Sequence, residues 1–471
     1  MVLRYGVVSG SKQRLVPSGS QDRVIRRTET CIIEAVNTPD APDIPAPNVL
    51  DLPVFRRLLV LIAVSGLAGS ALAVVLGYQI YTITGSPLAL GYLGLVEVIP
   101  AISLALFGGH VADRADRRSI LLVTQSVAVF CALFFAHLSS GPAPPAVTAL
   151  YAVVFLAGIA RGFSGPAFSA FEVQVVPREQ LLQASGYLTA TGQTFGILGP
   201  ALGGVVYDLA GPRAAYFGIA GLIAVGLICL MTIPLQPVPA PEKKAPDAPD
   251  ESIWQSIAIG VWFVFQTPAL VGSMALDLFA VLFGGAIALL PIFAKDILHV
   301  GAGGLGLLNA APSIGALSAT LLATRYPPLR HAGRNLLLSV GAFGVSIIVF
   351  ALSKNLALSL AALFLSGFFD GFSMVIRKAI IRLLSPDHMR GRIAAVSMIF
   401  VGSSNEIGAL ESGVAANYLG TARSVWLGGI VTLLIVAGTA YFAPGLRNLR
   451  LGSPSLPPVF PPSPPPPPSS E

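Results

Sequence analysis

The stretch GGHVADRADRRS, residues 108–119, places two Asp, three Arg and one His between two long apolar runs. In the whole chain of 471 residues only 11% are charged, whereas 54% are hydrophobic. A soluble protein would carry about 25% charged residues. These values indicate a polytopic membrane protein in which residues 108–119 form a short polar loop. The net charge of +6 does not indicate nucleic-acid binding, because in such a protein the positions of Lys and Arg matter more than their sum.

The chain contains twelve apolar runs in total, two before this loop and ten after it. Each is long enough to cross about 30 Å of hydrocarbon as a helix of about 20 residues. They lie near 55–82, 88–109, 119–138, 146–171, 181–209 and 214–235, and then near 268–294, 303–324, 335–352, 356–383, 391–417 and 424–443. A charged, Pro-rich segment separates the two groups of six. The predicted fold class is therefore an all-α membrane protein with two six-helix bundles.

The same pattern predicts the domain boundaries. We expect an N-terminal bundle at 51–235 and a C-terminal bundle at 268–445. A cytoplasmic linker at 236–267 joins them, and its Trp254 and Trp262 favour a helix lying in the membrane interface.

The two ends of the chain are polar. Residues 1–50 lack the apolar segment of a signal peptide, which indicates either a disordered cytoplasmic tail or a start codon assigned too far upstream. Residues 446–471 are rich in proline, and we expect a second disordered tail there. A ligand for a partner protein is the alternative interpretation of that polyproline segment.

The basic residues predict the orientation in the membrane. With the N-terminus inside, the cytoplasmic basic side chains are Arg114, Arg117, Arg118, Arg178, Lys243, Lys244, Arg325, Arg330, Arg334, Arg390 and Arg392. The outer loops carry only Arg213, Lys295, Lys354 and Arg423. Because Lys and Arg are enriched in cytoplasmic loops, both termini are expected in the cytoplasm.

The two groups of six also repeat each other at an offset of 209 residues. AGIARGFS at 157–164 aligns with SGFFDGFS at 366–373, and Gly199 aligns with Gly408 without a gap. Both groups begin after an even number of spans, so they run in the same direction across the membrane. Parallel repeats of this kind are typical of transporters built from two bundles.

The charged loop resembles the loop between spans 2 and 3 of the major facilitator superfamily, whose motif is approximately G-x-L-A-D-R-x-G-R-R. The matching positions are Gly109, Ala112, Asp113, Arg114, Arg117 and Arg118, whereas Val111 and Asp116 depart from it. The D-R-x-D-R-R form is similar to the branch that contains the enterobactin exporter and related transmembrane secretion effectors. The resemblance covers about residues 51–445.

This resemblance implies a conformational latch formed by Gly109, Asp113, Arg114, Arg117 and Arg118. In the superfamily the Asp and Arg of this loop bind span 11 and hold the outward-facing state. Asp113 would then face the N-terminal end of span 11, where the helix dipole is positive. The alternative is that the arginines only follow the positive-inside rule.

A second motif, GQTFGILGPALGG at 192–204, lies on the predicted fifth span. Its Gly199, Pro200, Gly203 and Gly204 match the G-P-x-x-G-G segment of antiporters in the superfamily. Pro200 would kink the helix, and the small residues would let it pack closely on a neighbour, by analogy span 8. Ordinary small-residue helix packing is the alternative.

The ionisable residues inside spans are the candidate substrate and proton sites. They are Arg161, Asp370, Glu97, Asp277 and Glu406. Arg161 and Asp370 occupy equivalent repeat positions, on spans that line the central cavity in the superfamily. Charges at mid-membrane are costly, and a carboxylate that alternates between dry and wet surroundings changes its pKa. The alternative is a structural ion pair that holds helices together.

We expect a secondary active transporter that exports a small amphipathic solute, such as a drug or siderophore, by proton-coupled antiport. The alternatives are an importer or lysolipid translocator on the same fold, or a non-transporting sensor or scaffold. Catalytic and P-loop motifs are lacking and the three Cys are far apart, so we expect no enzyme, cofactor, metal site or nucleic-acid partner. The expected location is the inner cell membrane, where the protein would act as a monomer.

Overall fold

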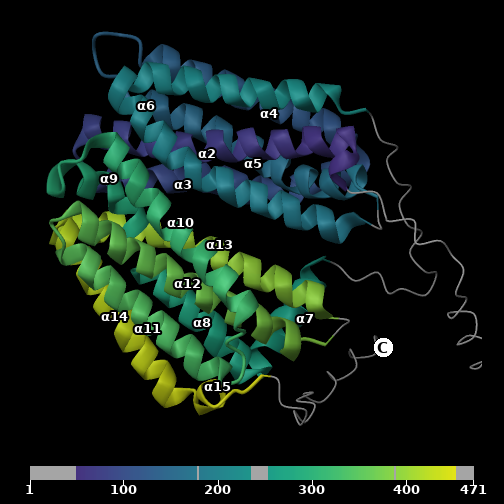
Figure 1. Ribbon diagram of the computed structural model, residues 1–471, viewed down its shortest axis with the longest axis vertical. Helices are drawn as coiled ribbons and strands as arrows, with labels where there is room; N and C mark the ends of the chain where they lie inside the picture. Colours follow the sequence, from purple (N-terminus) through teal and green to yellow (C-terminus); the bar gives the residue numbers. More distant parts are fainter. Residues whose placement is uncertain (1–48, 178–179, 235–252, 387–388, 452–471) are drawn as a thin grey trace, which may run out of the picture. The chain divides into compact units, whose positions relative to one another are not determined.

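The computed structural model describes residues 49–177, 180–234, 253–386 and 389–451, apart from a few helical side chains. Most of the two predicted tails and of the predicted linker lie outside these ranges. Figure 1 shows the described part as helices throughout. Residues 49–234 are called the first half and residues 253–451 the second half.

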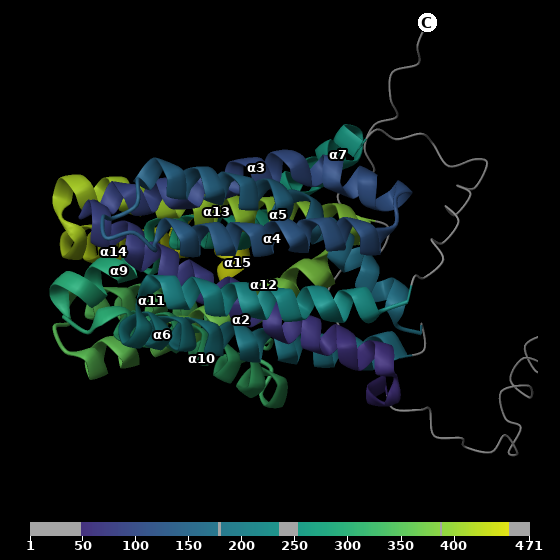
Figure 2. The same ribbon diagram turned by 90° about the horizontal axis from the view of Figure 1, so that it is seen from above.

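The first half contains η1 (Val49–Asp51), α2 (Pro53–Thr84), α3 (Pro87–Arg114), α4 (Arg117–Leu138), α5 (Val147–Val175) and α6 (Leu181–Thr232). The second half contains α7 (Ile253–Gln266), α8 (Pro268–Phe283), η3 (Ala286–Leu289), α9 (Leu290–Ile292), η4 (Phe293–Ile297), α10 (Gly301–Arg325), α11 (Ala332–Leu352), α12 (Leu356–Leu384), α13 (Arg390–Leu419), α14 (Thr421–Phe442) and α15 (Pro444–Arg447). In Figure 2 the long helices α3, α4, α5 and α13 lie roughly along the same axis, with neighbours in the chain such as α3 and α4 running in opposite directions.

Local sequence signals explain where several helices begin. Pro53 and Pro87 lie in the first turns of α2 and α3, where a missing N–H removes no helical hydrogen bond. Asp116 caps α4, because its carboxylate accepts hydrogen bonds from the Ser119 backbone N–H at 3.0 Å and from the Ser119 hydroxyl at 2.7 Å. The departure from the superfamily motif at Asp116 therefore supplies an N-cap.

The 209-residue offset extends to the helix boundaries. α5 and α12 are each 29 residues long and coincide at both ends after the shift. The first part of α6 and the whole of α13 also coincide, and each reaches a glycine of positive φ, Gly211 at 79° and Gly420 at 87°. Glycine adopts this conformation without a steric penalty. Gly211 thereby divides α6 into two helical parts.

Ten helices in the described part are long and apolar enough to cross a membrane. One of them, Gln183–Thr232, contains the break at Gly211, which separates the two spans predicted there. α13 is not among the ten, although its 30 residues are long enough for a crossing. The multi-pass helical architecture is confirmed, and the count of twelve spans stays a prediction.

The span predicted at 268–294 is not one continuous helix. α8 ends at Phe283, and three short helices continue the chain to Ile297. Gly284 and Gly285 lie at the break, and a Cβ atom at Gly285 would lie only 2.7 Å from the Ser412 hydroxyl oxygen of α13. The break is absent from the hydropathy pattern because the residues on both sides of it are apolar.

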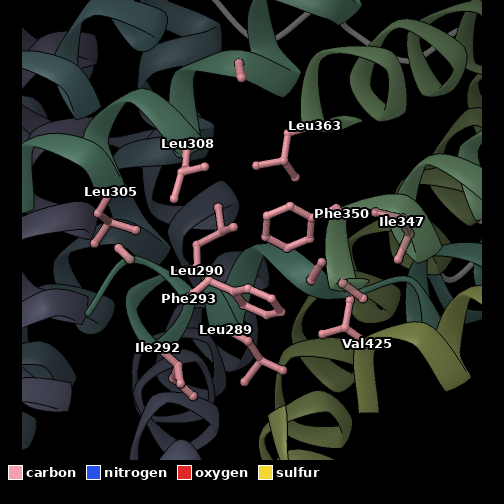
Figure 3. Packing of buried hydrophobic residues seen from close by; sticks show 14 of the residues in the cluster. Leu289, Leu290, Ile292, Phe293, Leu305, Leu308, Ile347, Phe350, Leu363 and Val425 are labelled. Atoms are coloured by element: carbon pink, nitrogen blue, oxygen red, sulfur yellow. The ribbon is translucent and has the colours of Figure 1, made fainter. Parts of the chain in front are cut away.

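One apolar cluster of the described residues is shared by the two halves. It joins Val74, Tyr81 and Leu90 of the first half to second-half residues that include Phe293 and Phe350, whose ring centroids lie 4.5 Å apart (Figure 3). The three other clusters each belong to a single half. The end where the halves share a core carries the turns after α2, at Gly211 and after α13, and is called the closed end.

Candidate functional site

A cavity of about 800 Å³ lies between the two halves. The first half lines it with residues from α2, α3, α4, α5 and α6, and the second half with residues from η3, α9, α10 and α13. Its polar lining residues are Ser65, Ser70, Glu97, Gln125, Arg161 and Ser164 from the first half and Asn309 from the second. The cavity wall is otherwise apolar or glycine, so its polar chemistry is concentrated on the first half.

An ion pair between Arg161 of α5 and Glu97 of α3 is the charged feature of this wall. Arg161 is the middle residue of α5, and the exposed fractions of the two side chains are 66% and 38%. Gly158, one turn earlier, lets α5 approach α3, because a Cβ atom there would lie 2.3 Å from the Glu97 carbonyl oxygen. The close helix crossing therefore brings the two charged side chains together in the cavity.

A second charged cluster lies in the second half and does not line this cavity. Asp277 of α8 forms an ion pair with Arg377 of α12, and an Asp370 oxygen lies 3.5 Å from another guanidinium nitrogen of Arg377. The exposed fractions of the Asp277, Arg377 and Asp370 side chains are 8%, 12% and 40%. Arg161 and Asp370 thus have separate partners in this conformation. The side chain of Glu406 lies outside the described residues.

Arg377 was not identified from the sequence. It lies beside Lys378 near the end of a predicted span, where the positive-inside rule already accounts for basic residues. The signal that could have identified it is its position seven residues after Asp370, because residues at that spacing share one face of a helix.

The residues of the predicted latch bond within the first half. Arg117 donates to the carbonyl oxygens of Ala112 and Ala170, at 3.4 and 3.2 Å. Arg118 donates to carbonyl oxygens of Leu230, at 3.2 Å, and of its neighbour. These contacts lie near the C-terminal ends of α3, α5 and α6, where the helix dipole favours cations.

The remaining latch residues make no described contact with α13. Arg114 is exposed, and a Cβ atom at Gly109 would have nothing within 4 Å. The side chain of Asp113 lies outside the described residues. In this conformation the neighbouring Gly108 makes the close approach instead, because its Cβ would lie 2.4 Å from the Gly162 carbonyl oxygen of α5. The latch stays a prediction.

The glycine-rich motif of α6 lies between two helices. A Cβ atom at Gly199 would lie 2.5 Å from a carbonyl oxygen of α2, and one at Gly203 would lie 2.8 Å from the Ala71 side chain of α2. On the other side, a Cβ at Gly204 would lie 2.1 Å from a carbonyl oxygen of α10, and the Pro200 carbonyl lies beside a glycine of α10. The motif therefore brings α6 close to α10 of the second half, the helix that corresponds to predicted span 8.

Polar contacts also join the halves at the closed end. The Asp208 carboxylate of α6 accepts hydrogen bonds from the backbone N–H groups of Ala302 and Gly303, at 2.9 and 2.6 Å, in the first turn of α10. The Tyr81 hydroxyl of α2 donates to the Asp296 carboxylate of η4. Sequence reasoning missed these residues because charged and polar side chains are expected wherever a span ends.

The structure thus has a cavity between two repeated halves, as in transporters built from two bundles. Comparison with known proteins identifies the family. The family model described as transmembrane secretion effector matches residues 46–450. The chain belongs to this family. The prediction of a major facilitator relative on this branch is therefore confirmed.

This transmembrane secretion effector is similar to curated enterobactin exporters. It is 26% identical over 410 residues to the enterobactin exporter EntS of Escherichia coli O1:K1 / APEC, which covers 86% of this chain and 95% of the relative. It is 27% identical over 347 residues to the enterobactin exporter of Citrobacter koseri, which covers 72% of this chain and 80% of the relative.

Solved transporters share its fold. A bacterial homolog of the human lysosomal transporter Spinster has a TM-score of 0.65 at 14% identity and covers 87% of this chain and 99% of its own. The nucleoside transporter NupG has a TM-score of 0.59 at 15% identity and covers 84% and 98%. The transmembrane secretion effector is therefore a multi-pass membrane transporter of the major facilitator fold, and not an enzyme.

Proposed function

We propose that this protein exports a small, amphipathic, siderophore-like solute from the cytoplasm by alternating access, in exchange for protons. It does so as a monomer in the inner membrane, with both termini in the cytoplasm. The observation that carries the proposal is the 800 Å³ cavity between the halves, with its apolar wall and its single ion pair of Glu97 and Arg161.

The contacts between the halves support alternating access. The shared apolar cluster and the Asp208 and Tyr81 hydrogen bonds all lie at the closed end. At the opposite end each half has an apolar cluster of its own. The positive-inside rule places the closed end outside, so the cavity of this conformation faces the cytoplasm, where an exporter loads its cargo.

The chemistry of the cavity supports an amphipathic cargo. Apolar walls bury the apolar surface of a ligand, while a small number of polar groups orient it. The Arg161 guanidinium can bind anionic or phenolic oxygens of the cargo. Those cargo oxygens would replace Glu97 as the partner of Arg161. The enterobactin exporters are the relatives that suggest a siderophore as the natural form of such a cargo.

A flux assay in efflux-deficient bacteria tests this function. Cells that express the protein should retain less of a siderophore or drug from a panel than control cells, and a protonophore should abolish the difference. Arg161→Ala should lose export at unchanged membrane abundance. Arg423→Ala removes an exposed arginine that does not line the cavity and serves as the matched control.

The outcomes separate the alternatives. Greater retention in expressing cells would indicate an importer, and transfer of a lysolipid between leaflets would indicate a translocator. Absence of any flux at normal membrane abundance would contradict transport and favour a sensor or scaffold.

A further inference from the structure

We propose that the cluster of Asp277, Arg377 and Asp370 is the proton-binding site of the transporter, separate from the cargo cavity, and that Asp370 carries the proton. This inference rests on the proposed antiport function and specifies one of its sites. The three groups belong to α8 and α12 of the second half. Three observations support the proposal: the charge balance of the cluster, the exposed fractions of its two carboxylates and a nearby buried hydroxyl without a hydrogen-bond partner among the described residues.

Charge balance separates the two ionised sites. Glu97 and Arg161 form a pair of one negative and one positive charge, so the pair is neutral, and an added proton would leave it with one uncompensated positive charge. The second site has two carboxylates around one guanidinium, so it carries one net negative charge when all three groups are ionised. An uncompensated charge inside a membrane protein is costly, and one added proton makes this site neutral.

The positions of the two carboxylates indicate which of them accepts the proton. Asp277 is only 8% exposed and is in direct contact with Arg377, so the two form the tighter ion pair of the site. Asp370 is 40% exposed and lies at 3.5 Å from the guanidinium, so its contact with Arg377 is looser and its carboxylate is more accessible. Of the two carboxylates, Asp370 is therefore the one that can bind a proton without breaking the Asp277–Arg377 pair.

An unpartnered hydroxyl group provides a second, independent observation. Ser373 is 1% exposed, and its oxygen has no hydrogen-bond partner among the described residues. Its position on α12, three residues after Asp370 and four before Arg377, places all three on one face of the helix. A buried hydroxyl without a partner is destabilising, so a water molecule or a protonated carboxyl beside it would satisfy the Ser373 hydroxyl.

Other charged groups near the site do not replace Arg377. The charged side chains described on the helices packed against α12 are Asp277 of α8, Arg325 of α10, Arg334 of α11 and Glu411 of α13. On α12 itself Lys378 is exposed, and Arg382 lies near the C-terminal end. Among the described residues, both ion pairs of the site are made by Arg377.

The proposed step conserves charge and atoms. A proton from the outer solution binds the Asp370 carboxylate and gives a neutral carboxyl group, which weakens its attraction to Arg377 and leaves the Asp277–Arg377 pair intact. Asp370 is the middle residue of α12, so a change in its contacts acts at the centre of a helix that packs on both α10 and α11. Release of the proton to the cytoplasm restores the negative site and completes the cycle.

The charge count makes an unusual prediction, because removing either carboxylate should have the same effect. Asp370→Asn and Asp277→Asn each leave one carboxylate opposite one guanidinium, and a neutral pair of this kind no longer needs a proton. Both variants should insert into the membrane, because neither leaves an uncompensated charge. Lys378→Gln, which removes an exposed charge next to Arg377, is the matched control.

The experiment uses purified full-length protein in vesicles, with enterobactin as the probe and a pH-sensitive dye inside. For the wild type and for Lys378→Gln, an imposed pH gradient should drive enterobactin against its concentration gradient, and enterobactin flux should move protons. In Asp370→Asn and Asp277→Asn the uphill movement and the proton signal should fall at least about tenfold, while downhill enterobactin movement continues.

The failures of the two proposals can be told apart. If the wild type moves enterobactin without any proton movement, antiport and the proton site are both wrong. If the wild type is coupled and either Asp variant, once inserted, remains coupled, the proton site alone is wrong. If the coupling is lost instead in Glu97→Gln while both Asp variants retain it, the proton site belongs to the cargo cavity.

Discussion

Removal of the Asp208 carboxylate is expected to open the closed end. Asp208 accepts two hydrogen bonds from the backbone of α10, at 2.9 and 2.6 Å, and these bonds join the first half to the second. A hydrogen bond to a charged group contributes about 1.5–3 kcal/mol. Gly303 is part-exposed, so water compensates for some of the lost hydrogen bonding. We therefore count the two Asp208 hydrogen bonds together as one such bond. At about 1.4 kcal/mol for each factor of ten, Asp208→Ala should raise the outward-open population roughly 10- to 150-fold.

Labelling of a cavity cysteine measures this population. In a variant without the native Cys31, Cys131 and Cys229, Asn309→Cys places a thiol on the cavity wall. A membrane-impermeant maleimide added to whole cells should label it slowly, because the closed end separates it from the outside. Asp208→Ala should accelerate labelling by the factor above, and Asp208→Asn, which keeps an acceptor oxygen without the charge, should have a smaller effect.

Two controls complete the experiment. Asn417 occupies the position equivalent to Asp208 at the 209-residue offset and is exposed, so Asn417→Ala should leave the labelling rate unchanged. In inverted vesicles the same reagent should label Asn309→Cys rapidly, which would show that the cavity opens toward the cytoplasm. An unchanged labelling rate for Asp208→Ala in whole cells would refute the role of this contact in closing the outer end.

Asp113→Asn should leave the protein in the membrane but reduce flux roughly tenfold, because the predicted latch places this charge at the N-terminal end of α13, where the helix dipole is positive; wild-type flux would contradict the latch. A shortened chain spanning 51–451 should insert and transport as the whole chain does, since the tails have too little apolar content to build a core. Gly204→Val should lower the melting temperature and prevent outer closure, because its Cβ would lie 2.1 Å from a carbonyl oxygen of α10. Arg161→Ala and Asp370→Ala should have additive effects on thermal stability, and a coupling above about 0.5 kcal/mol would indicate a direct pair.

Helix positions and the internal repeat could be predicted because they depend on local sequence. A segment inside a bilayer must satisfy its backbone hydrogen bonds within itself, so an apolar run of sufficient length becomes a helix. For this reason the predicted runs, apart from the one at 268–294, correspond to helices whose ends differ by only a few residues. The offset that aligns Gly199 with Gly408 also aligns the positive-φ glycines Gly211 and Gly420.

The interruption after Phe283 could not be predicted in the same way. Apolar residues continue on both sides of it, so hydropathy does not distinguish a broken span from a straight one. At the break Gly285 packs closely on α13, a helix more than a hundred residues later in the chain.

In the candidate site, too, some features could be predicted from the sequence and others required the tertiary structure. The sequence alone identified Arg161, Glu97, Asp277 and Asp370 as charges inside spans, because a charge among apolar residues is visible without a structure. Their partners were decided by tertiary structure. Glu97, rather than Asp370, pairs with Arg161 because the glycines of α5 let it cross α3 closely.

Composition, hydropathy and spacing by themselves determined that this chain is a helical membrane protein with a repeated architecture. Only the tertiary structure decided that Arg377 lies between two carboxylates and that Asp208 binds the first turn of α10. The physical reason is distance. An ion pair or hydrogen bond between two helices requires their side chains to approach within a few ångströms. That distance is set by how the helices rotate and pack, which cannot be read from the order of residues along the chain.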